Sequence, residues 1–160
     1  MKFFLSACLL ALVLFSATPA QEAPQGFEHW SVASLKQSAA ALKQKAQTSA
    51  DHSASERLAD FPNDLFMVAH REVDGAPEWH ETQADIFFVE SGTATLVVGG
   101  NLVGAEEVAP HEKRNAKIEG GARVSLAAGD VVRIPAKTPH QLLLNGSGEF
   151  NYFVVKVKNY

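Results

Sequence analysis

The sequence contains 160 residues, of which 46% are hydrophobic and 20% charged, and its formal net charge is −4 at pH 7. This balance is typical of a globular protein with one domain, and it argues against a disordered chain or a coiled coil. Without a basic excess the chain has no electrostatic field for a phosphate backbone, so we expect no nucleic-acid partner.

Residues 1–20 have the layout of a secretory signal peptide. Lys2 is their only charge, and the apolar run Phe3–Phe15 is shorter than the roughly 20 residues that cross a bilayer. Small residues follow, and Ala20 precedes Gln21 as a candidate cleavage site. We therefore predict a signal peptide over 1–20, a secreted or periplasmic protein, and no stable membrane insertion after cleavage.

Residues 21–60 are expected to form a linker and an N-terminal helix. From Trp30 to about Ala50, apolar residues recur three or four positions apart, at Val32, Leu35, Ala39, Leu42 and Ala46. Ser31 is a suitable N-cap for this helix. The apolar stripe is thin, so the helix is predicted to pack on the outside of a larger domain, with binding to a partner protein as the alternative.

The remaining residues, 61–160, have the pattern of a β domain. Six short runs rich in Val, Ile, Leu and Phe are separated by turns that contain glycine, which favours a sandwich or a closed barrel. These runs are Leu65–Val73, Ile86–Val89, Thr93–Val98, Val131–Pro135, Gln141–Leu144 and Phe150–Val157. Strands do not alternate with helices, so a parallel α/β sheet is not expected. The charged segment Val103–Lys117 is predicted to be a solvated loop at the mouth of the barrel.

Four of the six histidines are predicted to lie outside the functional site. His29, His52 and His111 fall in the linker, helix and charged-loop regions, and we expect them to be solvated. His70 and Glu72 share a face of a predicted strand. We interpret this pair as part of an exterior polar face, with contacts to the site or to a substrate as the alternative.

Two histidines and two carboxylates are the candidate site residues. Glu78 and His80 are two positions apart, so on a strand their side chains would share a face. Asp85 opens the next strand, where an ionised carboxylate that faces the interior is costly unless it is paired or bound to a metal. His140 follows a turn flanked by two prolines, which favours an inward position.

The spacing of these residues resembles the two motifs of the cupin superfamily. The segment 75–92 is similar to the first motif, because Asp85 and Gly92 have the spacing of its final part. The residues that follow the spacing of the second motif are Gly129, Pro135 and His140. The resemblance implies a mostly β fold, with a single cupin-type antiparallel β-barrel (jelly roll or double-stranded β-helix) over 61–160, preceded by the N-terminal helix.

The resemblance also implies a metal site. Cupin sites typically use two histidines and a glutamate from the first motif and one histidine from the second. Here Glu78 takes the first histidine position, His80 the second, Asp85 that of the glutamate, and His140 the last; the alternative register puts His80 first and Thr82 second. Two imidazoles with one or two carboxylates suit one divalent transition metal, Fe, Mn, Ni or Zn. A degenerate barrel that binds no metal is the alternative.

Three functions are consistent with this pattern. An enzyme would act on a small organic molecule as a metal-dependent oxygenase, isomerase or decarboxylase, with Glu78 as a fourth ligand or a general base. The base role requires a raised pKa, which burial among Phe87, Leu142 and Leu144 would supply. The alternatives are a metal-free ligand-binding or sensory cupin and a structural homodimer without catalysis. Candidates to bind an anionic substrate are Arg114, Arg123 and Arg133, although solvated arginines are more common.

Overall fold

The computed structural model describes residues 22–146 and 148–159, so the predicted signal peptide lies outside the described residues. The described chain forms one helix, α1 (Val32–Ala46), and thirteen strands. The strands are β1 (Ser53–Asp60), β2 (Asp64–Arg71), β3 (Trp79–His80), β4 (Ala84–Ser91), β5 (Thr93–Val98), β6 (Asn101–Val103), β7 (Glu106–Ala109), β8 (Glu112–Arg114), β9 (Lys117–Glu119), β10 (Ala122–Ala127), β11 (Val131–Ile134), β12 (His140–Leu143) and β13 (Phe150–Val157). Within these ranges no helix is long and apolar enough to cross a membrane.

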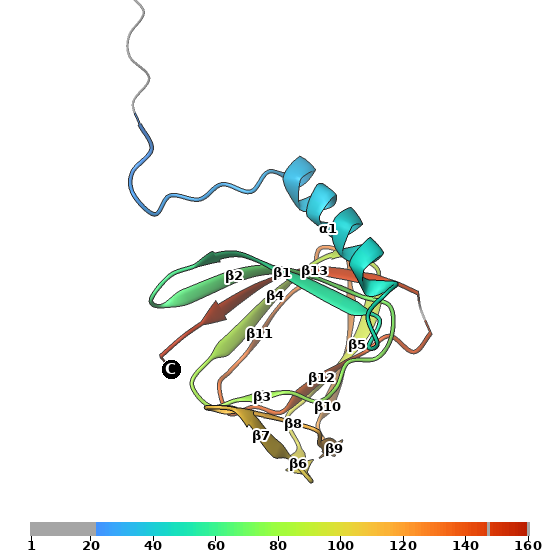
Figure 1. Ribbon diagram of the computed structural model, residues 1–160. Coiled ribbons are helices and arrows are strands. Elements are labelled where there is room, and N and C mark those ends of the chain that lie inside the picture. Colours follow the sequence, from blue (N-terminus) through green and yellow to red (C-terminus); the bar gives the residue numbers. More distant parts are fainter. Residues whose placement is uncertain (1–21, 147, 160) are drawn as a thin grey trace, which may run out of the picture.

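Two antiparallel sheets form the walls of the domain (Figure 1). The larger sheet has the strand order β1-β2-β13-β4-β11, and the smaller has the order β10-β5-β12. Apolar side chains from both sheets meet between them in one core, to which Phe87, Leu96, Leu126, Leu142 and Phe150 contribute. The predicted mostly β, antiparallel architecture with an N-terminal helix is confirmed, although the described strands of the two sheets do not join into one closed ladder.

The alternation of side chains along the strands decides which residues face the interior. Met67 and Ala69 of β2 line the interior, and so do Asp85 and Phe87 of β4. The next strand in the sheet, β13, contributes Tyr152, Val154 and Lys156. Three adjacent strands therefore carry both apolar and charged side chains into the same interior space.

Helix α1 covers the outer face of the larger sheet, where it packs on β1 and β2 (Figure 1). The predicted cap is present, since Ser31 accepts a hydrogen bond from the Ser34 backbone N–H. Leu42 and Ala46 are buried, whereas Val32 at the start of the predicted stripe is 71% exposed. Packing of the helix on the outside of the domain is thus confirmed.

The helix ends at Ala46, four residues before the predicted end. The hydroxyls of Thr48 and Ser49 donate to the backbone oxygens of Lys45 and Ala46, and Ser49 also donates to the oxygen of Ser53. Serine and threonine hydroxyls compete in this way with helical hydrogen bonds. The chain consequently turns at this point and enters β1.

Two edge strands did not stand out in the sequence. β1 lies within the segment predicted as linker and helix, and it pairs only with β2 in the larger sheet. β10 pairs with β5 at the edge of the smaller sheet, and Leu126 is its only buried residue. An edge strand in which at most one side chain is buried does not need a run of apolar residues. Such a run is the pattern from which strands are predicted.

The prediction of a solvated loop over Val103–Lys117 is wrong, because this segment contains β7 and β8 and borders β6 and β9. β7 pairs with β8, and β8 pairs in turn with β3, where Trp79 lies opposite Lys113 and His80 opposite Glu112. These strands are stabilised by backbone hydrogen bonds while their charged side chains remain exposed or half-buried, so the sequence shows no apolar alternation. Their pairing holds the segment against the strand that carries His80.

Candidate metal centre

Backbone pairing alone places the candidate residues next to one another. Glu78 and His140 form a β-bridge in which each N–H donates to the other residue's carbonyl oxygen, at 2.8 and 3.0 Å. His80 follows in β3, and its carbonyl oxygen accepts a hydrogen bond from the Lys137 N–H in the turn before His140. Asp85 reaches the same place from β4 of the larger sheet. Segments distant in sequence are thereby held around one point.

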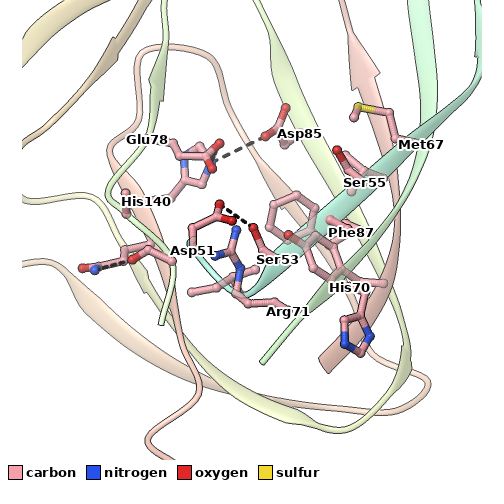
Figure 2. A pocket seen from close by; sticks show the side chains of 18 of the residues that line it. Asp51, Ser53, Ser55, Met67, His70, Arg71, Glu78, Asp85, Phe87 and His140 are labelled. Carbon is pink, nitrogen blue, oxygen red and sulfur yellow. Dashed lines mark hydrogen bonds and ion pairs between the residues drawn. The ribbon is translucent and has the colours of Figure 1, made fainter. Parts of the chain in front are cut away.

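The four predicted residues converge in space. His80 Nε2 lies 3.4 Å from Glu78 Oε2 and 3.4 Å from Asp85 Oδ2. His140 Nε2 lies 3.5 Å from Asp85 Oδ2 and 4.0 Å from Glu78 Oε2. Figure 2 shows Glu78, Asp85 and His140 directed toward one another at the end of a cavity. We call Glu78, His80, Asp85 and His140 the four-residue cluster.

The atoms of this cluster fit a divalent transition metal. Tetrahedral ligands at about 2.1 Å from an ion lie about 3.4 Å from each other, which matches three of the four distances. Imidazole nitrogen and carboxylate oxygen are also the donors that such ions take in proteins. The spacing and the chemistry of the donor set are therefore both suitable for one ion.

The orientation of the His140 ring supports the same conclusion. Its Nδ1–H donates to the Thr138 carbonyl oxygen at 3.1 Å, so in the neutral ring Nε2 carries the lone pair. That Nε2 atom is buried and has no hydrogen-bond partner among the described residues. A buried lone pair that faces carboxylate oxygens has no favourable partner, and a cation between them would accept electron pairs from the nitrogen and from the oxygens.

Lys156, which sequence reasoning missed, already places a cation beside two members of the cluster. Its Nζ donates to Asp85 Oδ1 and Oδ2 at 2.9 and 3.0 Å and to His80 Nε2 at 3.0 Å. The register of β13 against β4 pairs Lys156 with Asp85, so the contact follows from strand pairing. Its one visible signal was the alternation that puts Tyr152, Val154 and Lys156 on the same face.

Arg114 of β8 controls the charge of Glu78. Its Nη1 lies 2.7 Å from Glu78 Oε1, and its guanidinium also binds Glu112. Burial raises the pKa of Glu78, but the neighbouring ring of His80 and the charge of Arg114 outweigh it and hold the pKa well below its usual range. The raised pKa expected for Glu78 as a general base is therefore wrong, because its burial comes with two positively polarised partners.

Asp85 is also kept ionised. Burial raises its pKa, but the neighbouring rings of His140 and His80 and the charge of Lys156 outweigh this effect, and the pKa lies well below its usual range. The side chain of Asp85 is only 2% exposed. A buried carboxylate in this state is expected to be paired with a cation or bound to a metal.

Three members of the cluster, Glu78, Asp85 and His140, line a cavity of about 320 Å³. Apolar walls come from Met67, Phe87, Leu142 and Val154, and Tyr152 is almost fully buried beside them. This volume is at the lower end of the range for sites that bind small molecules. Thr82, the alternative to Glu78 in the first motif, does not line the cavity, whereas Glu78 does.

The other histidines lie away from the cluster. His29, His52 and His111 are exposed as predicted, and His111 pairs with Glu81 at 2.6 Å. His70 is only 1% exposed, so the interpretation of His70 as part of an exterior polar face is wrong. Its Nδ1 lies 2.8 Å from Asn151 Oδ1, and its Nε2 lies 3.3 Å from Glu72 Oε1. These polar partners make its burial tolerable.

The arginines considered for an anionic substrate differ in position. Arg114 lines the cavity, but both of its contacts described above are to glutamates of the protein. Arg123 and Arg133 are exposed and do not line the cavity, in agreement with the solvated positions considered more common.

Comparison with known proteins detects similarity in structure only. No protein-family model and no curated protein matches the sequence. An uncharacterised conserved protein with a double-stranded β-helix domain from Klebsiella pneumoniae has a similar structure, with a TM-score of 0.50, 17% identity, and coverage of 67% of this chain and 77% of that chain. The Cnp3 cupin domain of Schizosaccharomyces pombe has a TM-score of 0.51 at 8% identity, with coverage of 66% and 64%. At these identities the similarity concerns the fold.

Proposed function

Because the chain has the cupin fold and its strands bring two histidines and two carboxylates together, we propose that it is an exported protein that binds one divalent transition metal and acts on a small organic molecule. The single observation that carries this proposal is the buried Nε2 of His140, which faces carboxylate oxygens and has no hydrogen-bond partner in the described part of the chain. Export and the expected homodimer stay predictions from the sequence.

Each residue of the cluster has a role in this proposal. His80, His140, Asp85 and Glu78 would hold the ion, and Glu78 acts as a ligand and not as a base because its pKa is held low. A bound divalent metal would supply a Lewis acid for a small molecule if its coordination expanded beyond these four donors. Arg114 keeps Glu78 oriented and ionised from outside the cluster. The apolar walls of the cavity exclude water around the organic part of the ligand.

Removal of the two histidines tests the proposal. The purified protein, reconstituted anaerobically with Fe, Mn, Ni or Zn, is expected to retain about one metal per chain by elemental analysis. The double variant His80→Ala/His140→Ala is expected to lose at least about 100-fold in metal affinity, because two of the four donors are absent. The control His29→Ala/His111→Ala also removes two histidines, both exposed, and should keep the metal. A folded protein that takes none of these metals would overturn the proposal.

Lys156 favours a second candidate function, a metal-free cupin that binds a small molecule. Its ammonium group already neutralises Asp85 and occupies the lone pair of His80. In that case the lysine is the permanent cation of the site, and the cavity would bind its ligand without a metal. The two functions differ in whether Lys156 or a metal is the partner of His80 and Asp85.

Replacement of Lys156 tests whether this lysine competes with a metal for His80 and Asp85. We expect Lys156→Met to increase the metal affinity about tenfold or more, because a unit positive charge close to a divalent ion opposes its binding and competes for the same donor atoms. The measurement is a competition titration with a chromophoric chelator. Lys158→Met is the matched control, since Lys158 lies near the end of the same segment but pairs with Asp60. Unchanged or weaker affinity in Lys156→Met would show that Lys156 does not compete with the metal.

A further inference from the structure

Arg71, at the end of β2, is a charged residue of the cavity to which no role has yet been assigned. It follows Met67 and Ala69 in the alternation that faces the interior, and it lines the cavity together with Glu78 and Asp85. Figure 2 shows Arg71 in the cavity with its guanidinium toward the side where Glu78 and His140 lie. The cavity thus has Glu78, Asp85 and His140 of the four-residue cluster in one part of its wall and an arginine in another.

The charge of Arg71 has no anionic partner in the described structure. Three cations line the cavity in the ranges 22–146 and 148–159, and two of them are paired: Arg114 with Glu78, and Lys156 with Asp85. No carboxylate of the described residues lies within 4.0 Å of the Arg71 guanidinium, and its Nε is buried without a hydrogen-bond partner. Buried polar groups in proteins are normally satisfied, so an unsatisfied donor in a cavity points to a ligand.

Asp51 is a third carboxylate that lines the cavity, and it does not pair with Arg71. One of its oxygens accepts a hydrogen bond from the Ser53 hydroxyl at 2.7 Å, and it forms no ion pair with Arg71. That hydrogen bond also lowers the pKa of Asp51. Asp51 therefore stays ionised at the cavity and will repel a ligand that carries more than one negative charge.

The surroundings of Arg71 hold the guanidinium in place for a ligand. Gly75 leaves space beside it, because a Cβ at this position would lie 3.1 Å from Arg71 Cζ. Tyr152 of β13 lines the same cavity as Arg71, and burial raises the pKa of its hydroxyl. The hydroxyl consequently remains protonated at neutral pH and is a second potential donor. A planar guanidinium with a neighbouring hydroxyl is suited to a carboxylate, which Arg binds through two parallel hydrogen bonds.

We propose that the small organic molecule bound in this cavity is a monocarboxylic acid whose carboxylate binds Arg71. Its organic part would lie along Phe87, Leu142 and Val154, between Arg71 and the four-residue cluster. A single unpaired arginine matches a single negative charge, whereas a phosphate dianion would leave a second charge unpaired near Asp51. This inference rests on the proposed function, because it names the class of molecule that the site would receive.

The test compares acids with their amides, which have nearly the same shape but no charge. Binding of benzoate and benzamide, and of hexanoate and hexanamide, is measured by calorimetry on the purified protein, with inorganic phosphate as a separate probe. We expect at least one of the two acids to bind with a Kd of about 1 mM or tighter, and its amide to bind at least about tenfold more weakly. Failure of both acids to bind, equal binding of acid and amide, or stronger binding of phosphate would overturn the inference.

Variants of Arg71 identify the residue responsible. Arg71→Met is expected to lose at least about tenfold in affinity for the acid, and Arg71→Lys should lose less because it keeps the charge but not the two parallel hydrogen bonds. Arg123→Met is the matched control, since this exposed arginine of β10 does not line the cavity. If Arg71→Met does not fold, the test uses Arg71→Lys alone. The affinity of this variant for the acid and for its amide then shows whether the preference for the acid depends on Arg71. Unchanged affinity in a folded Arg71 variant would overturn the inference.

Metal content measured on the same samples distinguishes this inference from the proposed function. A protein that takes up metal but binds the acid independently of Arg71 would overturn the inference alone. A protein that takes up no metal but binds the acid through Arg71 would overturn the metal-dependent function and support the inference that Arg71 binds a carboxylate. The acid titration is therefore carried out both with bound metal and in the presence of a chelator.

Discussion

Replacement of Asp85 by alanine is expected to lower the free energy of unfolding of the metal-free protein by about 3 kcal/mol. Asp85 is almost fully buried and binds Lys156 through both of its oxygens. Removal of one partner of a buried ion pair typically costs about 3–5 kcal/mol, because the other charge is left in a poorly solvated place. We place the effect at the lower end, since the Lys156 side chain is 16% exposed and can move toward water. Urea unfolding in the presence of a chelator measures it.

A double-mutant cycle shows whether the loss comes from the pair. Asp85→Ala/Lys156→Met removes both charges, and it is expected to be more stable than the sum of the two single losses predicts, by at least about 1 kcal/mol. The chelator matters because a bound metal would itself stabilise the folded parent protein and hide the effect of the pair. Additive losses in the cycle would mean that Asp85 stabilises the fold by contacts other than the one with Lys156.

Replacement of Gly92 by alanine is expected to lower the free energy of unfolding by about 2–5 kcal/mol. Gly92 lies in the tight turn between β4 and β5 and has a φ of +84°. A Cβ at this position would lie 2.1 Å from the backbone oxygen of Glu149, which cannot swing away as a side chain would. The conformational cost of a positive φ, about 1–2 kcal/mol, is thus added to the cost of overpacking against backbone, about 1–3 kcal/mol. Urea unfolding of the variant measures the total.

Gly129→Ala is the matched control for this prediction. Gly129 has a φ of +93°, but a Cβ there would have no neighbour within 4 Å. Its replacement should therefore cost only about 1–2 kcal/mol, the conformational part alone. Equal losses for Gly92→Ala and Gly129→Ala would show that the backbone of Glu149 can move and that the close approach does not limit residue 92.

The sequence predicted the central strands well because their residues are buried. Thr93–Val98 and Phe150–Val157 have the bounds that were predicted, and both strands have neighbours on two sides. Burial requires apolar residues, and these residues leave a visible run. β1 and β10 lie at sheet edges and β7 is entirely exposed, so their strand conformation depends on backbone pairing that leaves little trace in residue type.

The candidate site was predictable to the extent that motif spacing determines it. Glu78, His80, Asp85 and His140 were identified from their spacing, and the structure brings these four side chains together. Lys156 and Arg71 were missed, because their relevance depends on the pairing of β13 with both β2 and β4. No local pattern specifies a register between segments that lie 60 or more residues apart. The pKa of Glu78 was misjudged for a related reason, since Arg114 reaches it only through the unpredicted pairing of β8 with β3.

The position of β13 has a consequence for the order in which the protein can fold. β2 and β4 are close in sequence, yet they do not pair with each other, because β13 lies between them and bonds to both. Until residues 150–157 have been synthesised, β2 and β4 each present an unpaired edge, and such edges tend to pair with other chains. The rate-limiting event is expected to be the insertion of β13, a contact of long sequence separation and therefore slow. A chaperone that recognises this protein would accordingly act on an intermediate in which the central position of the larger sheet is still vacant.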